Sequence, residues 1–372
     1  MNIYDYIDEY GIYSFNEKVF NEVDAVIFSF LSYVDFSNIL DHGKHTIKEI
    51  GRMHLGLHHR NEDNIIAVTD ATKILTYLKD SKRYKDCIVF NHEYVGNKKV
   101  QFGAISIEYL PGKVFVSFEG TDELFSGWIE DFMLSYEFPT ASHKLAINYL
   151  NKHYTFSLKE LIIGGHSKGG NLALVAGMYA NAFVRAKIKT IYNCDGPGLL
   201  EKEFNSSKYQ RILPKYIHII PEYSVVGIIL NHSKDSVIKS SVKGLLAHDI
   251  IYWQINRNKF ERANLSNQSI EMDNDIQKWL AKYNRQDKRV FADNLNYILY
   301  RSDIQSLLDL KNEKKKILDL IKESKEMDAS TKKMITDLIA ILLKSVKTTR
   351  EIEVKNFISK NINIVKKTFK KN

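Results

Sequence analysis

The sequence is poor in cysteine, in proline and in long apolar runs. Its 372 residues include 2 cysteines and 5 prolines. Two thiols, Cys87 and Cys194, exclude a disulfide framework and a zinc site built from four cysteines. No apolar run approaches the roughly 18 residues that span a bilayer, and the first residues lack the basic and apolar regions of a signal peptide. We therefore expect a cytoplasmic protein.

The chain does carry the material for a large folded core. Hydrophobic residues make up 44% of it and charged residues 26%, which is typical of a globular protein and excludes global disorder. The aromatic residues include 21 Tyr and 19 Phe. The length suits one large α/β domain with attachments or two modest domains.

The net charge of +8 is concentrated at one end of the chain. Residues 311–372 hold 17 Lys or Arg against 8 Asp or Glu, while the preceding 310 residues hold 36 basic and 37 acidic groups. The body is therefore nearly neutral and the tail is basic. Such a tail is a candidate contact for an anionic membrane surface, although Lys-rich solvated helix faces are common. The sequence gives no strong nucleic-acid signal.

Strand and helix patterns alternate through most of the chain. Residues 20–28 combine helix and strand signals, 38–79 have a polar helical pattern, and 171–183 show the spacing of an amphipathic helix. Strands are predicted at 87–90, 100–107, 113–119, 158–165, 188–193, 216–220 and 236–241. This alternation predicts an α/β fold with a parallel core and right-handed crossovers.

From residue 302 onward the pattern changes to long helical periodicity without strands. We therefore expect an α/β domain over residues 1–300 and a basic helical C-terminal extension over residues 301–372.

The segment Gly165-His166-Ser167-Lys168-Gly169 fits the G-x-S-x-G pattern of a nucleophile elbow. Flanking glycines let a strand and a helix pass closely, and the sharp turn between them exposes the serine hydroxyl. The N–H of Lys168 would then lie at a helix N-terminus, where it can stabilise an oxyanion. The motif follows a predicted buried strand and precedes a predicted helix, so we predict Ser167 as a nucleophile. The alternative is a phosphate-binding or purely structural glycine turn.

Other segments resemble class 3 lipases. Residues 113–121, followed by 128–132, resemble the strand, the Gly-Thr turn and the Asp-Trp-x-x-Asp region of that family, except that the first Asp is Gly127 here. Together with 164–173, 193–198 and 248–253, they make residues 20–256 similar to an uncharacterised bacterial lipase-like α/β-hydrolase family related to class 3 lipases.

This resemblance implies the α/β-hydrolase fold, with a mostly parallel central sheet. It also implies that the Gly-Thr turn supplies a second oxyanion donor, which maps onto Thr121. The resemblance is specific for the fold and weak for the substrate.

In this fold the triad follows the chain order Ser, then Asp or Glu, then His. Three histidines follow Ser167. His218 lies in an apolar strand, where we expect a packed histidine, and His232 lies in a polar turn that we expect to face solvent. His248 follows the last predicted strand and a short loop, so it is the predicted base. Its alternative role is that of a capping or surface histidine.

Two carboxylates compete for the role of the acid. Asp195 ends the strand after the elbow helix and begins a tight Asp-Gly-Pro-Gly turn, and we favour it; its alternative role is to form that turn. Glu222 ends the next strand, near where class 3 lipases carry an Asp, although Ser224 can also align there. Asp249 adjoins the base but points away from it if the segment is extended.

Weaker signals have plainer explanations. A metal could use the i, i+4 spacing of His54 and His58, followed by His59, but a polar helix face is the simpler interpretation. The Lys168 side chain could recognise an anionic substrate, yet we expect it to face solvent.

We expect Cys194 to be a small buried strand residue rather than a nucleophile. The aromatic residues Trp128, Phe125 and Phe132 could line an acyl pocket or a lid, or belong to the core.

The sequence therefore predicts a serine esterase or lipase-like hydrolase that acts on small-molecule or lipid esters. Ser167 attacks the carbonyl, His248 takes its proton and Asp195 orients His248. We expect no cofactor and no metal. A different class of function is a non-catalytic α/β scaffold that binds a partner protein, an anionic membrane or nucleic acid through its basic helical tail.

Overall fold

The computed structural model describes residues 1–37, 39–40, 43–54, 66–97, 100–121, 132–301, 328–334 and 337. The chain divides into two compact units. The first comprises Met1–Asp122 and Phe138–Leu265, and the second comprises Glu123–Glu137 and Ser266–Asn372. The expected extension over 301–372 lies mostly outside the described residues, so the predicted boundary after residue 300 stays a prediction.

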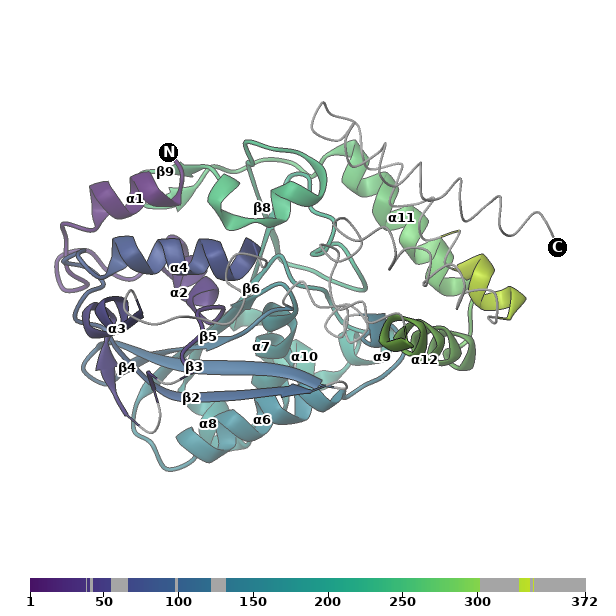
Figure 1. Ribbon diagram of the computed structural model, residues 1–372, viewed down its shortest axis with the longest axis horizontal. Coiled ribbons are helices and arrows are strands. Elements are labelled where there is room, and N and C mark those ends of the chain that lie inside the picture. Colours follow the sequence, from purple (N-terminus) through teal and green to yellow (C-terminus); the bar gives the residue numbers. More distant parts are fainter. Residues whose placement is uncertain are drawn as a thin grey trace. The chain divides into compact units, whose positions relative to one another are not determined.

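An eight-stranded sheet forms the centre of the first unit, and its strand order follows the chain (Figure 1). Neighbouring strands from β1 to β4 are antiparallel, and those from β4 to β8 are parallel. The strands are β1 (His45–Thr46), β2 (Ile88–Asn97), β3 (Val100–Leu110), β4 (Lys113–Phe118), β5 (Glu160–His166), β6 (Ile188–Cys194), β7 (Tyr216–Pro221) and β8 (Asp235–Ile238). This mostly parallel sheet with flanking helices confirms the predicted α/β-hydrolase fold.

Helices cover both faces of this sheet (Figure 1). One face carries α1 (Ile3–Tyr10), α2 (Glu22–Leu31), α3 (Ile47–His54) and α4 (Ile66–Leu78). The other carries α6 (Ala141–Tyr154), α7 (Lys168–Tyr179), α8 (Ala182–Lys187) and α10 (Ser207–Ile212). The side chains of β4 show why two layers form: Phe115 packs into the first core, while Val114, Val116 and Phe118 pack into the second.

Shorter elements complete the first unit. They are α9 (Glu201–Phe204), the 3₁₀ turns η2 (Leu213–Lys215), η3 (Gly244–His248) and η4 (Ile250–Tyr252), and the hairpin of β9 (Ile255–Asn256) with β10 (Lys259–Phe260).

The strand signal that we inferred in residues 20–28 is wrong, because the segment enters the helix α2. Asn21 caps this helix: its side chain accepts hydrogen bonds from the N–H groups of Val23 and Asp24, and Asp24 bonds back to the N–H of Asn21. Every residue from Val23 to Leu31 is buried. A helix that is enclosed on all sides is apolar all round, which hides the helical periodicity in the sequence.

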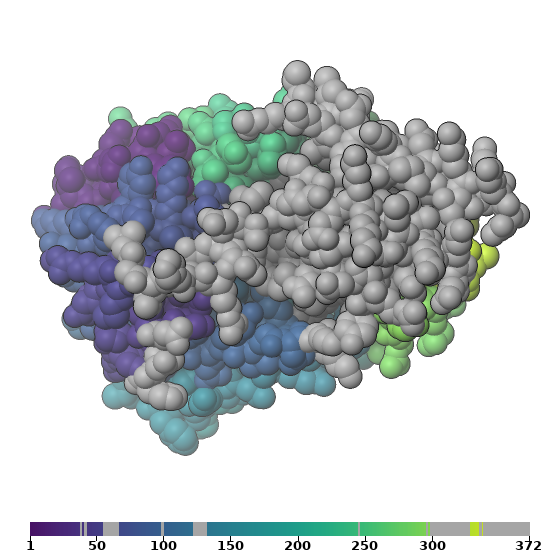
Figure 2. Space-filling view, in the orientation of Figure 1, coloured from purple at the N-terminus to yellow at the C-terminus, as the bar shows by residue number. Residues whose placement is uncertain are grey.

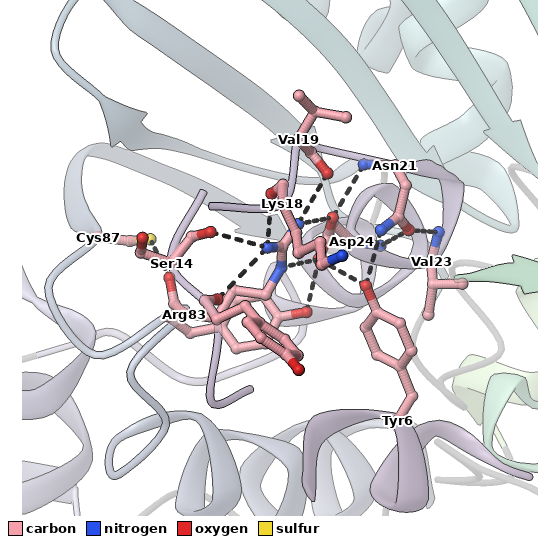
Figure 3. Close-up of polar contacts among 11 residues, drawn as sticks. Tyr6, Ser14, Lys18, Val19, Asn21, Val23, Asp24, Arg83 and Cys87 are labelled. Atoms are coloured by element: carbon pink, nitrogen blue, oxygen red, sulfur yellow. Dashed lines mark hydrogen bonds and ion pairs between the residues drawn. The ribbon is translucent and has the colours of Figure 1, made fainter. Parts of the chain in front are cut away.

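A buried ion pair within the first unit joins α2 to the segment that follows α4 (Figure 3). The Asp24 carboxylate accepts hydrogen bonds from Arg83 Nε at 2.8 Å and Nη2 at 2.6 Å, and from the hydroxyl of Tyr84 at 2.7 Å. Arg83 also donates to the carbonyls of Lys18, at 2.8 Å, and Val19, at 3.1 Å. Both charged side chains are inaccessible to solvent, so each group compensates the charge of the other.

The N-terminus lies against the segment around residue 250 (Figure 2). The Met1 ammonium donates to the carbonyl of Ile255 at 3.1 Å, and the Ile255 N–H donates back to the Met1 carbonyl at 2.8 Å. The predicted base, His248, therefore lies on a segment that the first residues of the chain hold in place.

The second unit contains α11 (Asn267–Ala281) and α12 (Arg285–Arg301). Phe132 is half-buried and packs there against Trp279 and Phe291, with ring centroids 5.8 and 4.8 Å away. Trp128 and Phe125 lie outside the described residues. In the part of the chain that the structure covers, we find no helix whose length and apolarity would let it cross a membrane.

His54 lies at the C-terminal end of α3 and is buried, so it does not belong to an exposed polar helix face as we expected. His58 and His59 fall outside the described residues.

Candidate active site

Ser167 stands at the turn between β5 and α7, where the G-x-S-x-G pattern places it. Its backbone has φ 57° and ψ −132°, which lies outside the regions that a serine ordinarily adopts. The Ser167 N–H donates to the carbonyl of Cys194, at the end of β6, at 2.9 Å. Backbone strain of this kind costs on the order of 1–3 kcal/mol and persists only where the surroundings enforce it.

The glycines around Ser167 allow three elements to meet at this turn. A Cβ on Gly169 would lie 2.1 Å from the backbone oxygen of Phe118, and one on Gly165 would lie 2.3 Å from the backbone carbon of Gly169. The ends of β4 and β5 and the first turn of α7 are therefore in direct backbone contact. This contact holds the serine in its strained conformation.

Asp195 directly follows β6 and is completely buried, with φ 50°. One carboxylate oxygen accepts a hydrogen bond from His248 Nδ1 at 2.6 Å. The other accepts hydrogen bonds from the Ser224 hydroxyl and from the Gly227 N–H, the latter at 3.1 Å. These contacts orient the carboxylate towards the imidazole of His248.

His248 ends η3 and keeps 23% of its side chain exposed. Because Nδ1 donates to a carboxylate, a neutral His248 presents the lone pair of Nε2, which is the tautomer that a general base requires. Among the described residues, no hydrogen bond joins the Ser167 hydroxyl to His248. In hydrolases such a contact often tightens only in the substrate complex.

His166, the variable residue before the serine, is a neighbour that the motif alone did not single out. Its ring lies 4.4 Å from that of His248, its Nε2 bonds to the His248 carbonyl at 2.8 Å, and its Nδ1 lies 3.1 Å from the Tyr33 hydroxyl. Burial lowers the pKa of His166 well below its ordinary value, and the nearby His248 lowers it further. His166 is therefore neutral, donating from Nε2 and accepting at Nδ1.

The alternative acids occupy other positions. Glu222 accepts a hydrogen bond from the Ser240 N–H at 3.3 Å. Ser224, which can align with the acid of class 3 lipases, donates its hydroxyl to Asp195. The carboxylate that contacts His248 is therefore Asp195, and its role in catalysis stays a prediction.

Asp249 lies beside His248, the predicted base, but forms a different pair. The segment is not extended: η3 and η4 flank Asp249, which caps η4 by accepting from the Ile251 N–H at 3.2 Å. Its carboxyl group hydrogen-bonds to that of Asp70, on α4. Burial, and after it the charge of Asp70, raise the pKa of Asp249 to about 7.

The two residues expected to supply oxyanion donors flank the same turn. Lys168 is the first residue of α7, where helix N–H groups lack partners within the helix. Thr121 follows Gly120. A Cβ added to Gly120 would lie 1.9 Å from the Tyr33 hydroxyl and 2.5 Å from the His166 carbonyl oxygen. The Gly-Thr turn thus packs directly against the turn that carries Ser167. That these N–H groups bind an oxyanion stays a prediction.

The expectation that the Lys168 side chain faces solvent is wrong. Lys168 is only 1% exposed, and its ammonium donates to the Gln101 carbonyl, on β3, at 3.0 Å. The first turn of α7 packs inside the protein, so the ammonium binds a backbone carbonyl in place of water.

The other predictions for single residues have mixed outcomes. Cys194 is buried on β6 and His218 on β7, as predicted for both. His232 was expected to face solvent, but only 15% of its side chain is exposed and its Nδ1 bonds to Asp235 at 2.8 Å. The Asp235 carboxylate, three residues later, holds the imidazole ring of His232 against the protein.

A family model covers residues 78–297 of this chain, under the description Mbeg1-like. The chain belongs to the Mbeg1-like family. The matched region contains Thr121, Ser167, Asp195 and His248. Membership in this lipase-like family supports a hydrolase-like function in general.

Further comparisons add little to the Mbeg1-like assignment. Among solved structures, the chain is similar to the crystal structure of M37 lipase, with a TM-score of 0.35 and 14% sequence identity. The similarity covers 55% of this chain and 68% of that one. A comparison with curated proteins found no match.

Proposed function

We propose that this protein is a serine hydrolase that cleaves carboxylic esters through an acyl-enzyme. The observation that carries the proposal is the hydrogen bond between His248 Nδ1 and the buried Asp195 carboxylate, at 2.6 Å. This pair belongs to the same site as Ser167, whose φ of 57° is typical of a nucleophile elbow. His166 supports the arrangement because it holds the His248 carbonyl from the residue next to the nucleophile.

In the proposed mechanism, Ser167 Oγ attacks the ester carbonyl carbon while its proton passes to His248 Nε2. The Asp195 carboxylate stabilises the imidazolium that forms. The N–H groups of Lys168 and Thr121 stabilise the negative charge on the former carbonyl oxygen. The alcohol then leaves with the proton from His248. A water molecule, deprotonated by the same imidazole, hydrolyses the acyl-serine and restores the free enzyme.

The proposal is tested by labelling the full-length protein with a fluorophosphonate, which reacts readily only with an activated serine. We expect Ser167→Ala and His248→Ala to abolish the labelling. Ser157→Ala and His153→Gln are matched controls, because both residues lie at the α6–β5 end of the first unit and outside the proposed triad. We expect both controls to label like the wild type.

Full labelling of Ser167→Ala, or no labelling of a folded wild type, would contradict the proposal. If the wild type is labelled, a panel of esters with different acyl chains then defines the substrate class. The same Ser167→Ala variant must lose the ester hydrolysis for this activity to belong to the site.

A further inference from the structure

Three side chains that can bind metal converge outside the proposed active site. They are His218 on β7, His232 in the turn before β8, and Asp235 at the start of β8. Their ligand atoms all lie within 4.8 Å of one another. The Nδ1 atoms of His218 and His232 lie 2.8 Å from the two different oxygens of the Asp235 carboxylate.

The fold explains how residues so far apart in sequence meet here. β7 and β8 are parallel neighbours, and their register pairs His218 directly with Asp235. His232 precedes Asp235 by three residues, and Lys234 between them has φ 62°, which turns the chain back on itself. The cluster therefore combines one strand position with a tight turn at the start of the next strand.

The hydrogen bonds of His218 leave a conflict that a cation would resolve. Its Nε2 lies 3.1 Å from the carbonyl oxygen of Gly196, which can only accept, so Nε2 carries a proton. In a neutral ring, Nδ1 then presents a lone pair to the Asp235 oxygen 2.8 Å away. Two acceptors at this distance repel each other. Either His218 carries a full positive charge while completely buried, or a cation lies between the two groups.

Asp235 presents both oxygens of its carboxylate to imidazole nitrogens: one lies 2.8 Å from His218 Nδ1 and the other 2.8 Å from His232 Nδ1. An ionised carboxylate and two imidazole nitrogens form a donor set that suits zinc and related divalent ions.

We propose that His218, His232 and Asp235 bind a divalent transition-metal ion of the zinc type. Ligands on a tetrahedral zinc ion lie about 3.3 Å apart, at zinc–ligand distances of about 2.0–2.2 Å, and the atoms of this cluster need only small movements to reach that spacing. The bond from His218 Nε2 to the Gly196 carbonyl is the kind of outer contact that orients a metal-binding histidine. Asp235 is exposed, so an ion can reach the site from solvent.

This metal site is independent of the proposed hydrolase chemistry, and no catalytic step passes through it. Gly196 directly follows Asp195, however. A metal that holds His218 in place therefore also supports the turn that carries the predicted acid. The sequence alone did not suggest the site, because its three residues follow no metal-binding spacing.

The test measures zinc binding by the full-length protein after chelator treatment, using isothermal titration calorimetry and the shift in melting temperature. We expect one equivalent of zinc to bind and to raise the melting temperature. The variants His232→Ala and Asp235→Asn should bind at least tenfold more weakly. They alter the more accessible ligands, since replacing the buried His218 could disrupt folding.

The matched control is His153→Gln, which removes another histidine that bonds to a carboxylate, that of Glu93, at 2.6 Å. We expect it to bind zinc like the wild type. Absence of zinc binding to the folded wild type would overturn the proposal, and the cluster would then be a buried charged histidine with its carboxylate. Binding that survives both His232→Ala and Asp235→Asn would also overturn it, because the ion would then lie elsewhere. Neither readout depends on hydrolase activity.

Discussion

At the scale of single residues, the proposed site depends on which carboxylate reaches His248. Asp195 does so from a completely buried position and is held there by Ser224 and Gly227. Glu222 lies one strand further along and bonds to the Ser240 N–H instead. Because the acid stabilises one tautomer of the base, replacing it with an amide tests the assignment without removing the side chain.

We predict that Asp195→Asn lowers kcat for ester hydrolysis by about 10³–10⁴-fold, as expected when the orienting carboxylate of a Ser-His-Asp triad is lost. The control Glu222→Gln should retain activity within about threefold, because neutralising a carboxylate outside the proposed triad leaves the chemical step intact. Steady-state kinetics on both purified variants measures this difference. A larger loss in Glu222→Gln than in Asp195→Asn would reverse the assignment.

The Asp249–Asp70 pair should make stability depend on pH. The pKa of Asp249 is raised to about 7 in the folded protein, chiefly by burial and then by Asp70. The folded state therefore binds this proton more tightly than the unfolded chain does. Its stabilising effect is complete below about pH 4, the ordinary range of an Asp carboxyl, and is lost as the pH rises through 7.

We predict that raising the pH from 5 to 8 increases the free energy of unfolding of Asp249→Asn, relative to that of the wild type, by about 1–3 kcal/mol. The variant retains a capping side chain but has no carboxyl group to lose its proton. Urea denaturation at the two pH values measures the change. Asp86→Asn, at an exposed position, should show no such trend. A gain in Asp249→Asn that is equal at both pH values would contradict the prediction.

At the scale of elements, the turn at Ser167 depends on how closely α7 approaches β4 and β5. The Gly169 Cα faces the Phe118 backbone oxygen, so any side chain there forces two backbones apart. Gly177, in the same helix, faces mainly the tip of the Ile191 side chain, where a Cβ would lie 2.5 Å from Cδ1. A side-chain tip can move, whereas a backbone in a central strand cannot.

We predict that Gly169→Ala lowers the free energy of unfolding by about 2–3 kcal/mol, owing to overpacking, and also lowers activity. Gly177→Ala should change stability by less than about 1 kcal/mol, because the better helix propensity of Ala offsets the small clash. Thermal and urea unfolding of both variants test the contrast. Equal losses of unfolding free energy in Gly169→Ala and Gly177→Ala would contradict the prediction, because the backbone contact with Phe118 would then tolerate a Cβ as well as the Ile191 side chain does.

At the scale of the whole molecule, the buried pair of Asp24 and Arg83 joins distant parts of the first unit. Arg83 reaches carbonyls at Lys18 and Val19 as well as the Asp24 carboxylate on α2. Its neighbour Lys82 forms an ion pair of similar length with Glu17, at 2.9 Å, but that pair is exposed. The two adjacent cations therefore differ mainly in burial.

We predict that Arg83→Met destabilises the protein by about 3–5 kcal/mol, because it leaves the Asp24 charge buried without a partner. Lys82→Met should cost far less, as is usual for an exposed ion pair. Urea denaturation of both variants provides the comparison. A small loss in Arg83→Met would show that water reaches Asp24.

The basic tail is the other feature at this scale, and we propose that it contacts anionic membrane surfaces. Residues 356–372 contain five lysines and no acidic residue. Replacing these lysines with Gln should weaken binding to vesicles that contain anionic lipid, by about 1 kcal/mol for each lysine near the surface. Binding by the wild type should also fall as salt is added. Vesicle co-sedimentation measures both effects, and salt-insensitive binding would contradict the proposal.

Local patterns were enough to predict the strand, turn and helix around Ser167 and most of the other strands. Short-range sterics and periodicity decide this region. Residues close to one another in the sequence specify the strand before Ser167, the glycines on either side and the helix after it. The helix α2 was misjudged for a related reason: its burial on all sides removes the polar face that would reveal its period.

Contacts between distant residues could be decided only by tertiary structure. Asp195 and His248 are separated by 53 positions, and the sequence left Asp195 and Glu222 both open as the acid. Strand register and packing decide three further contacts: that of Lys168 with β3, that of His166 with His248, and that of His218 with Asp235. A residue's own neighbours specify its backbone conformation, but which side chains it faces depends on how the strands and helices assemble.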